Sequence, residues 1–421
     1  MITYKAELFD QFQYLYEVTG FSDHQIHCVI CFGDQIKLKL MRKALYLLFE
    51  SVPILSSVYH HNKGNSYWES IDPKKINGFF TIAKDEQEFQ NFSATKTNES
   101  TGPQIRACVY QKEKAELAVI VNHMICDGAG FKQLLYLLSD LYSNLIVNEN
   151  YSPADIISGD RGINRVITEL SILDRAKALL LYRKDSNQES QVQFPMSREG
   201  ETAPFIISHK ISEDSYRGIS RYCSKNNVTF NDVILAAFDR VLARYVKVEG
   251  NYLKIPIMVD MRRYLKDKRF CALTNLSSSI TTKIRINPGE AFDETVRKVN
   301  EDMKRQKLRN IGVNGFVKLS IVYRLFPGKI GYHLLEKGLK NPLICMTNIG
   351  VIDSEQLVFQ GSRIEDVFLC GSIKYRPHFQ MAVTSFRETM TLSSNLYGSS
   401  RDRVRMKKFL SEVGKELSNL S

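Results

Sequence analysis

The sequence predicts an α/β protein of two lobes, each a mixed sheet with helices. Three observations lead to this fold class. The chain has 421 residues, more than one hydrophobic core usually organises. Strand-like and helix-like segments alternate in both halves, as in α/β proteins. Residues 183–202 are polar with one proline and one glycine, the composition of an exposed connection. We therefore expect an N-terminal lobe at 1–182, a linker at 183–203 and a C-terminal lobe at 204–421.

The first half contains two predicted strand–helix pairs. The segment "HQIHCVICF", 24–32, alternates and is rich in β-formers, which indicates a strand. Residues 36–52 carry apolar side chains at helical spacing and end before Pro53, which indicates a helix. The apolar segment "AELAVIVNHMI", 115–125, is predicted to be a central strand. Residues 130–146 repeat Leu and Tyr at three- and four-residue steps, as in an amphipathic helix.

The second half restarts the alternation. Residues 229–245 predict a helix, with Thr229 as N-cap and Asp232 favouring the positive helix end. The other expected elements are strands at 204–212, 252–263 and 277–287, a helix at 291–309 and a hairpin at 379–398.

Composition limits the class of protein. Hydrophobic content is 43% and charged content 24%, as in soluble globular proteins. The start lacks a signal-peptide pattern and no 18-residue apolar run occurs, so we expect a cytoplasmic protein without a membrane span. Eight cysteines without regular spacing are expected to be free thiols. The net charge of +11 fits either a solvated basic surface or a basic entrance for a phosphorylated donor. No nucleic-acid-binding motif accompanies this charge, so no nucleic-acid partner is expected.

One motif carries candidate chemistry. In "VNHMICDGAGF", 121–131, His123 ends an apolar strand, Asp127 follows four residues later, and Gly128 and Gly130 open the next helix. Ligands bind at strand ends in α/β proteins. Imidazole suits proton removal from a hydroxyl or amine because its pKa lies near neutrality. The glycines allow the backbone to pass close to a substrate. The alternative is a core histidine satisfied by backbone, with Asp127 capping the helix.

Other motifs indicate nothing specific. Cys28 and Cys31 have CxxC spacing, but residues three apart on a strand face opposite sides, and no second pair completes a metal site. No metal is therefore expected. A GxSxG elbow is absent, and "DGAGF", 127–131, lacks phosphate-loop spacing.

With these residues in view, "NHMICDGAGF" resembles the HxxxDG signature of the chloramphenicol acetyltransferase-like superfamily. That group includes condensation domains of nonribosomal peptide synthetases and stand-alone acyltransferases. Five further stretches resemble the family's other segments: "VPILSSVYH" (52–60), "VTFNDVILAAFDRVL" (228–242), "VDMRRYL" (259–265), "LTNLSSSI" (273–280) and "MTNIGVID" (346–353). The resemblance implies two chloramphenicol acetyltransferase-like lobes with a tunnel between them.

The resemblance also implies residue roles. His123 would be the general base, and Asp127 would turn away from the imidazole to form an ion pair, with Arg262 as first and Arg263 as second candidate partner. Gly128 belongs to the motif, and the family places substrate or tunnel residues where this chain has Asn275, Ser277, Thr347 and Asn348. Two departures stand out: Asn122 occupies the position of the condensation domains' extra histidine, and the plant enzymes' DFGWG motif is absent. No oxyanion-stabilising residue is assigned.

The expected function is that of an acyltransferase moving an acyl group from a thioester to a hydroxyl or amine. The donor would be acyl-CoA or an acyl carrier protein, the acceptor a small molecule, and no cofactor would be bound permanently. Two alternatives stay open: condensation of carrier-bound substrates into an amide, and a binding protein on the same scaffold without turnover. Because two lobes in one chain can form the site, a monomer is expected.

Overall fold

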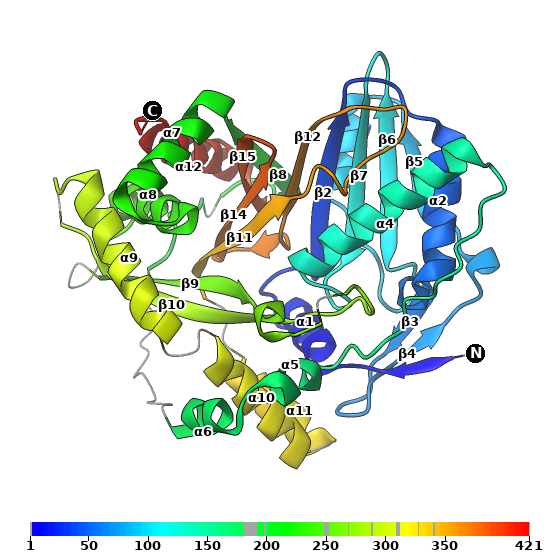
Figure 1. Cartoon of the computed structure of the whole chain (residues 1–421), viewed down its shortest axis with the longest axis horizontal. Coiled ribbons are helices and arrows are strands. Elements are labelled where there is room, and N and C mark those ends of the chain that lie inside the picture. Colours follow the sequence, from blue (N-terminus) through cyan, green and yellow to red (C-terminus); the bar gives the residue numbers. More distant parts are fainter. Residues whose placement is uncertain are drawn as a thin grey trace.

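The computed structural model describes residues 2–180, 192–197, 199–247, 252–267, 269–287, 289–308, 312–326, 328–339 and 342–420. Two sheet-centred lobes lie side by side in Figure 1, which confirms the predicted α/β fold class. Much of the expected linker, 183–191 and residue 198, lies outside the described residues. The exact boundary between the lobes therefore stays a prediction.

The N-terminal lobe is built on a five-stranded mixed sheet. Its strand order is β12 (Ile364–Cys370), β2 (Gln25–Phe32), β7 (Ala115–Asn122), β6 (Ile105–Gln111) and β5 (Phe80–Ala83). All neighbours are antiparallel except the parallel pair β5–β6. A second sheet of three short strands, β1 (Thr3–Lys5), β4 (Tyr67–Ser70) and β3 (Ser57–His60), lies beside it, with the single turns η1 (Pro53–Ser56) and η2 (Pro73–Lys75) in the adjoining loops.

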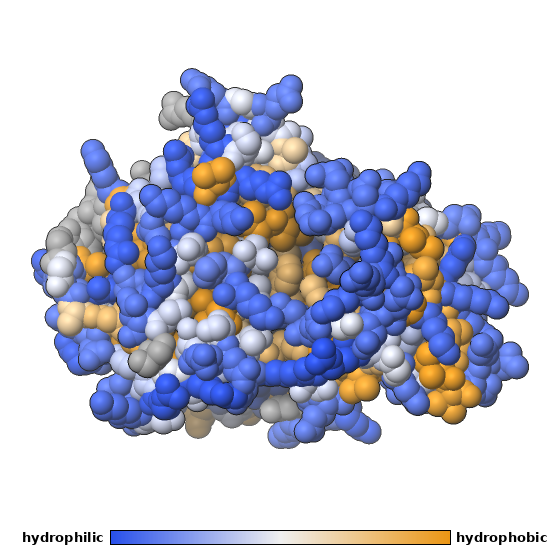
Figure 2. All heavy atoms as spheres, turned by 90° about the horizontal axis from the view of Figure 1, so that it is seen from above, coloured by the Kyte–Doolittle hydropathy of each residue, from blue (hydrophilic) through white to orange (hydrophobic). Residues whose placement is uncertain are grey.

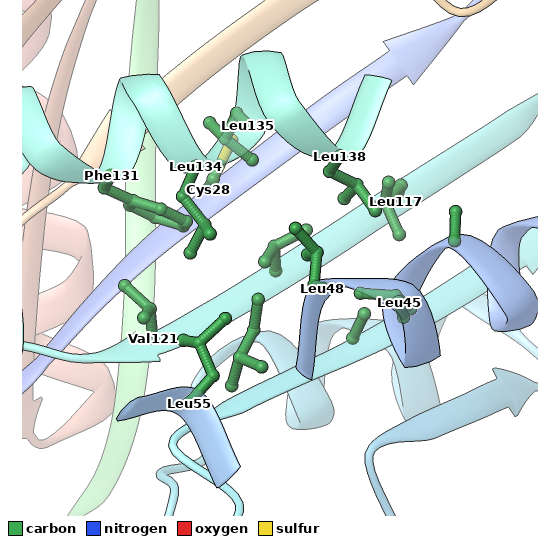
Figure 3. Packing of buried hydrophobic residues seen from close by; sticks show 14 of the residues in the cluster. Cys28, Leu45, Leu48, Leu55, Leu117, Val121, Phe131, Leu134, Leu135 and Leu138 are labelled. Carbon is green, nitrogen blue, oxygen red and sulfur yellow. The ribbon is translucent and has the colours of Figure 1, made fainter. Parts of the chain in front are cut away.

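Strand β7 is buried on both faces, as its apolar sequence predicts. Alternate side chains of a strand point to opposite sides, so Leu117 and Val121 pack with α2 (Leu38–Ser51) and α4 (Gly128–Val147) in one core cluster. Figure 3 shows this layer, with Leu45 and Leu48 of α2 and Leu134, Leu135 and Leu138 of α4 packed together on the same face of β7. The intervening Ala118 and Ile120 pack with α3 (Glu86–Ser93) on the other face.

The C-terminal lobe is built on a seven-stranded mixed sheet. The strand order is β10 (Ser277–Arg285), β9 (Tyr252–Asp260), β11 (Ile344–Ile352), β14 (Phe379–Phe386), β15 (Thr389–Gly398) and β13 (Lys374–Tyr375), and β8 (Ala203–Ile211) also pairs with β15. The helices of this lobe are α7 (Glu213–Asn226), α8 (Phe230–Tyr245), α9 (Phe292–Leu308) and α12 (Ser400–Ser418). Thr229 and Asp232 form a capping box at the start of α8, so this predicted helix start is confirmed.

Two features tie the lobes together. Strand β12 comes from the second half of the sequence yet pairs antiparallel with β2 in the first lobe's sheet. Below the sheets in Figure 1, helices from both halves share a third core cluster. These helices are α1 (Leu8–Val18), α5 (Asn164–Glu169), α6 (Ile172–Leu180), α10 (Val313–Leu325) and α11 (Lys329–Gly338). The division of the chain by sequence is therefore not a complete division in space.

The strands expected at 115–125 and 252–263 each end three residues early, and both ends matter for the site. Strand β7 stops at Asn122, and residues 123–125 form a turn. Strand β9 stops at Asp260, whose side chain accepts from the N–H of Arg262 and begins the single turn η4 (Met261–Tyr264). Polar side chains at the strand ends thus replace ladder hydrogen bonds.

Most of the face drawn in Figure 2 is polar, with apolar atoms visible toward the middle and at one end. Among the described helices, none has the length and apolar character needed to cross a bilayer. Cys28 and Cys31 lie on β2. All eight cysteines are free thiols. The described residues contain no group of three or more His, Cys, Asp or Glu side chains arranged to hold a metal.

Candidate active site

The turn after β7 is held by the side chain of Asn122. Its Nδ2 donates to Gln104 Oε1 at 2.7 Å, and its Oδ1 accepts from the N–H of Met124 at 2.9 Å. The N–H of Ile125 also donates to the Asn122 carbonyl at 3.2 Å. Asn122, at the position of the extra histidine of condensation domains, therefore uses its side chain to shape the turn.

The backbone of His123 is fixed by a hydrogen bond, whereas the buried Nδ1 of its ring has no side-chain partner. Its N–H donates to the carbonyl of His24 at 2.7 Å. Nδ1 is buried and makes no hydrogen bond of ordinary geometry, while the residue as a whole is partly exposed. Burial lowers the pKa of His123 and outweighs the raising effects of backbone carbonyls and Asp127, and the charge of Lys374 adds a small further lowering. The imidazole is therefore neutral at neutral pH.

Asp127 uses both carboxylate oxygens on groups other than the imidazole and joins three separate parts of the chain. Its Oδ1 accepts from the N–H of Gly130 at 2.9 Å and so caps α4. Its Oδ2 accepts from Arg262 Nη1 at 2.8 Å and from the N–H of Leu276 at 2.7 Å. Burial raises the pKa of Asp127, but Arg262 and these donors outweigh it and hold the pKa below its ordinary value. The carboxylate is therefore ionised and structural in its contacts.

The segment Leu273–Leu276 of the second half lies against the His123 turn. Asn275 Nδ2 donates to the carbonyls of His123 at 2.8 Å and Met124 at 3.0 Å, and Asn275 is 3% exposed. Arg262 Nη2 donates to the carbonyl of Thr274 at 2.8 Å. Asn275, expected to line a tunnel, thus uses both amide hydrogens on the backbone of the turn.

Three other expected site residues lie on strand β10 or β11. Ser277 begins β10 opposite Asp260. Thr347 and Asn348 lie on β11 and are partly exposed. Asn348 Oδ1 accepts from the N–H of Gly350 at 2.9 Å. The structure forms no hydrogen bond between these three side chains and His123 among the described residues, and their contact with substrate stays a prediction.

The two motif glycines are places where the lobes come close. A Cβ atom on Gly128 would lie 3.3 Å from Ile349 Cγ2 of β11, and one on Gly130 would lie 3.2 Å from the carbonyl oxygen of Thr274. Neither has a positive φ. A side chain at either position would crowd the second lobe, and the expected close passage of a substrate along this backbone stays a prediction.

Two lysines of the region were not singled out by the sequence. Lys132 on α4 donates to the carbonyls of Ile349 at 3.0 Å and Val351 at 3.1 Å, bridging to β11. Lys374 of β13 is partly exposed, and its charge acts on the pKa values of His123, Cys345 and His378. No local pattern marks either residue, because both act on segments distant in sequence.

Comparison with known proteins shows the same fold in several solved structures. The first condensation domain of the calcium-dependent antibiotic synthetase superposes with a TM-score of 0.72 at 15% identity, covering 100% of this chain and 98% of that one. Polyketide synthase associated protein 5 from Mycobacterium tuberculosis gives 0.69 at 13% identity, covering 99% and 97%. The trichothecene 15-O-acetyltransferase TRI3 from Fusarium sporotrichioides also gives 0.69 at 13%, covering 99% and 95%.

Among curated sequences, nonribosomal peptide synthetase nlsA of Emericella nidulans is 21% identical over 208 residues. The match covers 47% of this chain but 3% of that synthetase.

The chain shares its fold with condensation domains and with an acetyltransferase, as the sequence predicts. More particularly, residues 273–420 match the family model described as the WS/DGAT C-terminal domain. At identities of 13–15%, these solved structures establish the fold alone.

Proposed function

We propose that the protein is an acyltransferase in which His123 is the general base. The observation that carries the proposal is the state of its ring, which is partly exposed, has a lowered pKa and leaves its buried Nδ1 without a side-chain partner. We place the ring hydrogen on Nδ1, on which the backbone carbonyls of His123 and Cys126 act, so that Nε2 is the nitrogen that accepts a proton.

The reaction follows from that assignment. Nε2 takes the proton of an acceptor hydroxyl or amine as the acceptor's oxygen or nitrogen attacks the thioester carbonyl carbon. The tetrahedral intermediate collapses with cleavage of the C–S bond, and the imidazolium returns the proton to the departing thiolate. General-base assistance of this kind contributes about 10²- to 10⁴-fold in rate. The donor is acyl-CoA or an acyl carrier protein, and the acceptor is a small molecule.

The experiment is mass spectrometry of products after mixed alcohols and amines are offered with a panel of acyl-CoA donors. His123→Ala should lose about 10²- to 10⁴-fold in rate with an unchanged circular-dichroism spectrum. His333→Ala, at an exposed histidine of α11, is the matched control and should keep full activity. Full transfer activity in a folded His123→Ala protein would end the proposal.

The match to synthetase nlsA favours a second candidate, amide formation between carrier-bound substrates. The same assay with acyl-loaded carrier protein in place of acyl-CoA separates the two. Turnover with carrier-bound substrates alone would favour the second candidate. A protein that binds acyl-CoA without any product would instead be a binding protein on this scaffold.

A further inference from the structure

A second buried ion pair lies behind the His123 turn. Arg161 contacts Asp10 of α1 through two parallel hydrogen bonds, Nη1 to Oδ2 at 3.0 Å and Nη2 to Oδ1 at 2.9 Å. Arg161 is 9% and Asp10 1% exposed at the side chain. Trp68 Nε1 also donates to Asp10 Oδ2 at 2.8 Å. Asp10 is therefore a fixed anchor that sets the orientation of the guanidinium plane.

The remaining donors of Arg161 reach the two segments that form the site. Nε donates to the carbonyl of Leu273 at 2.8 Å, and Nη2 also lies 3.4 Å from the carbonyl oxygen of Ile125. In return, Thr274 Oγ1 donates to the carbonyl of Arg161 itself. Arg161 thus contacts both the His123–Asp127 turn and the segment Leu273–Leu276.

The segment Leu273–Leu276 is consequently held near its start by two arginines, and at its end by the bond from the N–H of Leu276 to Asp127. Arg161 binds the carbonyl of Leu273, and Arg262 binds the carbonyl of Thr274 at 2.8 Å. Between them and the turn, Asn275 donates to the carbonyls of His123 and Met124. A displacement of this segment would therefore move the backbone from which the His123 ring projects.

We propose that Arg161, anchored by Asp10, is a positioning residue that holds His123 in its working orientation through Leu273–Leu276; this inference rests on the proposed function. Arg161 does not touch the reacting atoms. Arginine is needed because a planar fork with five N–H donors serves Asp10, Leu273 and Ile125 together. A lysine ammonium keeps the charge opposite Asp10 but has no second arm for the carbonyls.

Arg161→Lys in the full chain tests this difference. The kcat for transfer should fall roughly 10- to 100-fold, since small misplacements of a catalytic group have effects of that size. KM should stay within about two-fold, and the Tm should stay near that of the wild type because the ion pair persists. Arg165→Lys is the matched control, because Arg165 lies four residues on and its guanidinium makes an exposed hydrogen bond to the carbonyl of Asp160.

A direct readout of the ring separates positioning from a purely structural role. In a histidine Cε1–Hε1 NMR titration, with His123→Ala identifying the signal, Arg161→Lys should move the midpoint of His123 upward, because a loosened turn is better hydrated. Asp127 and Lys374, the charged side chains that act on His123, are unchanged in that variant. Thr274→Val, which removes only the hydroxyl that bonds Arg161, should give a smaller shift in the same direction.

An unchanged kcat and an unchanged His123 midpoint in folded Arg161→Lys protein would overturn the inference. So would Arg161→Ala losing activity that Arg161→Lys fully restores, since the ion pair alone would then suffice. If folded His123→Ala keeps its activity, the proposed function fails, and the NMR comparison still decides whether Arg161 positions the ring. If Arg161→Lys does not fold, an unchanged kcat and an unchanged His123 midpoint in Thr274→Val would overturn the inference instead.

Discussion

Arg262 Nη1 lies 2.8 Å from Asp127 Oδ2 and joins the end of β9 in one lobe to the HxxxDG turn in the other. Both side chains are largely buried, at 21% and 6% exposed. The Arg262 charge is also shared with Asp260 at 3.2 Å. The motif aspartate therefore connects the lobes and leaves the histidine ring to other partners.

Removing either partner of this ion pair should lower the free energy of unfolding. Asp127→Ala leaves Arg262 buried beside only one carboxylate, and it also removes the cap of α4. We expect a loss of about 3 kcal/mol or more in the free energy of unfolding, measured by urea denaturation. Arg269→Ala, which breaks an exposed pair with Asp267, serves as control and should leave the midpoint unchanged. An Asp127→Ala protein with a wild-type urea midpoint would show that the pair is not structural.

Asn275→Ala should impair activity more than stability. The change leaves the carbonyls of His123 and Met124 without their side-chain donor. Unpaired buried groups cost about 1–3 kcal/mol each, though water entering the space left by the amide reduces the loss. The turn should loosen and kcat should fall roughly 10-fold. Asn77→Ala, at an exposed position, is the control. Wild-type kcat in folded Asn275→Ala would contradict the role of this amide.

The dependence of transfer on pH follows from the lowered pKa of His123. The base must be neutral to accept a proton, so kcat/KM should rise with pH through a midpoint below the ordinary 6.5 and then level off. The midpoint lies below 6.5 because burial disfavours the charged imidazolium. An acceptor that does not titrate in this range is needed for the measurement. A midpoint above 6.5 would mean that a cation-stabilising environment surrounds the ring.

Gly130→Ala should destabilise the protein although alanine favours helices. The added Cβ would lie 3.1 Å from Cys126 Cβ and 3.2 Å from the carbonyl oxygen of Thr274, and the backbone of Leu273–Leu276 has little room to move. Gly315→Ala on α10 is the matched control, since its Cβ meets only Ser278 Oγ at 3.8 Å. That control should gain about 0.5–1 kcal/mol. Equal gains at both sites, measured by thermal unfolding, would show that the lobes are not in close contact at Gly130.

Local patterns predicted the elements and the central motif. Helix α8 begins where Thr229 and Asp232 indicate, because a capping box is formed by residues three apart. The run from β7 through the turn to α4 was readable for the same reason. The family resemblance predicts Arg262 as the partner of Asp127, and their distance of 2.8 Å depends on how the two lobes pack together.

Local sequence is enough to predict the α/β class, the periodicity of each strand and helix, and a histidine at the end of a buried strand. Those features depend on residues within one or two turns of each other. The pairing of β12 with the first sheet, the ion pair between Arg161 and Asp10, and the bond from Asn275 to the turn are seen in the folded chain alone. Each of these joins segments more than 100 residues apart, and such pairings depend on how the two cores pack together.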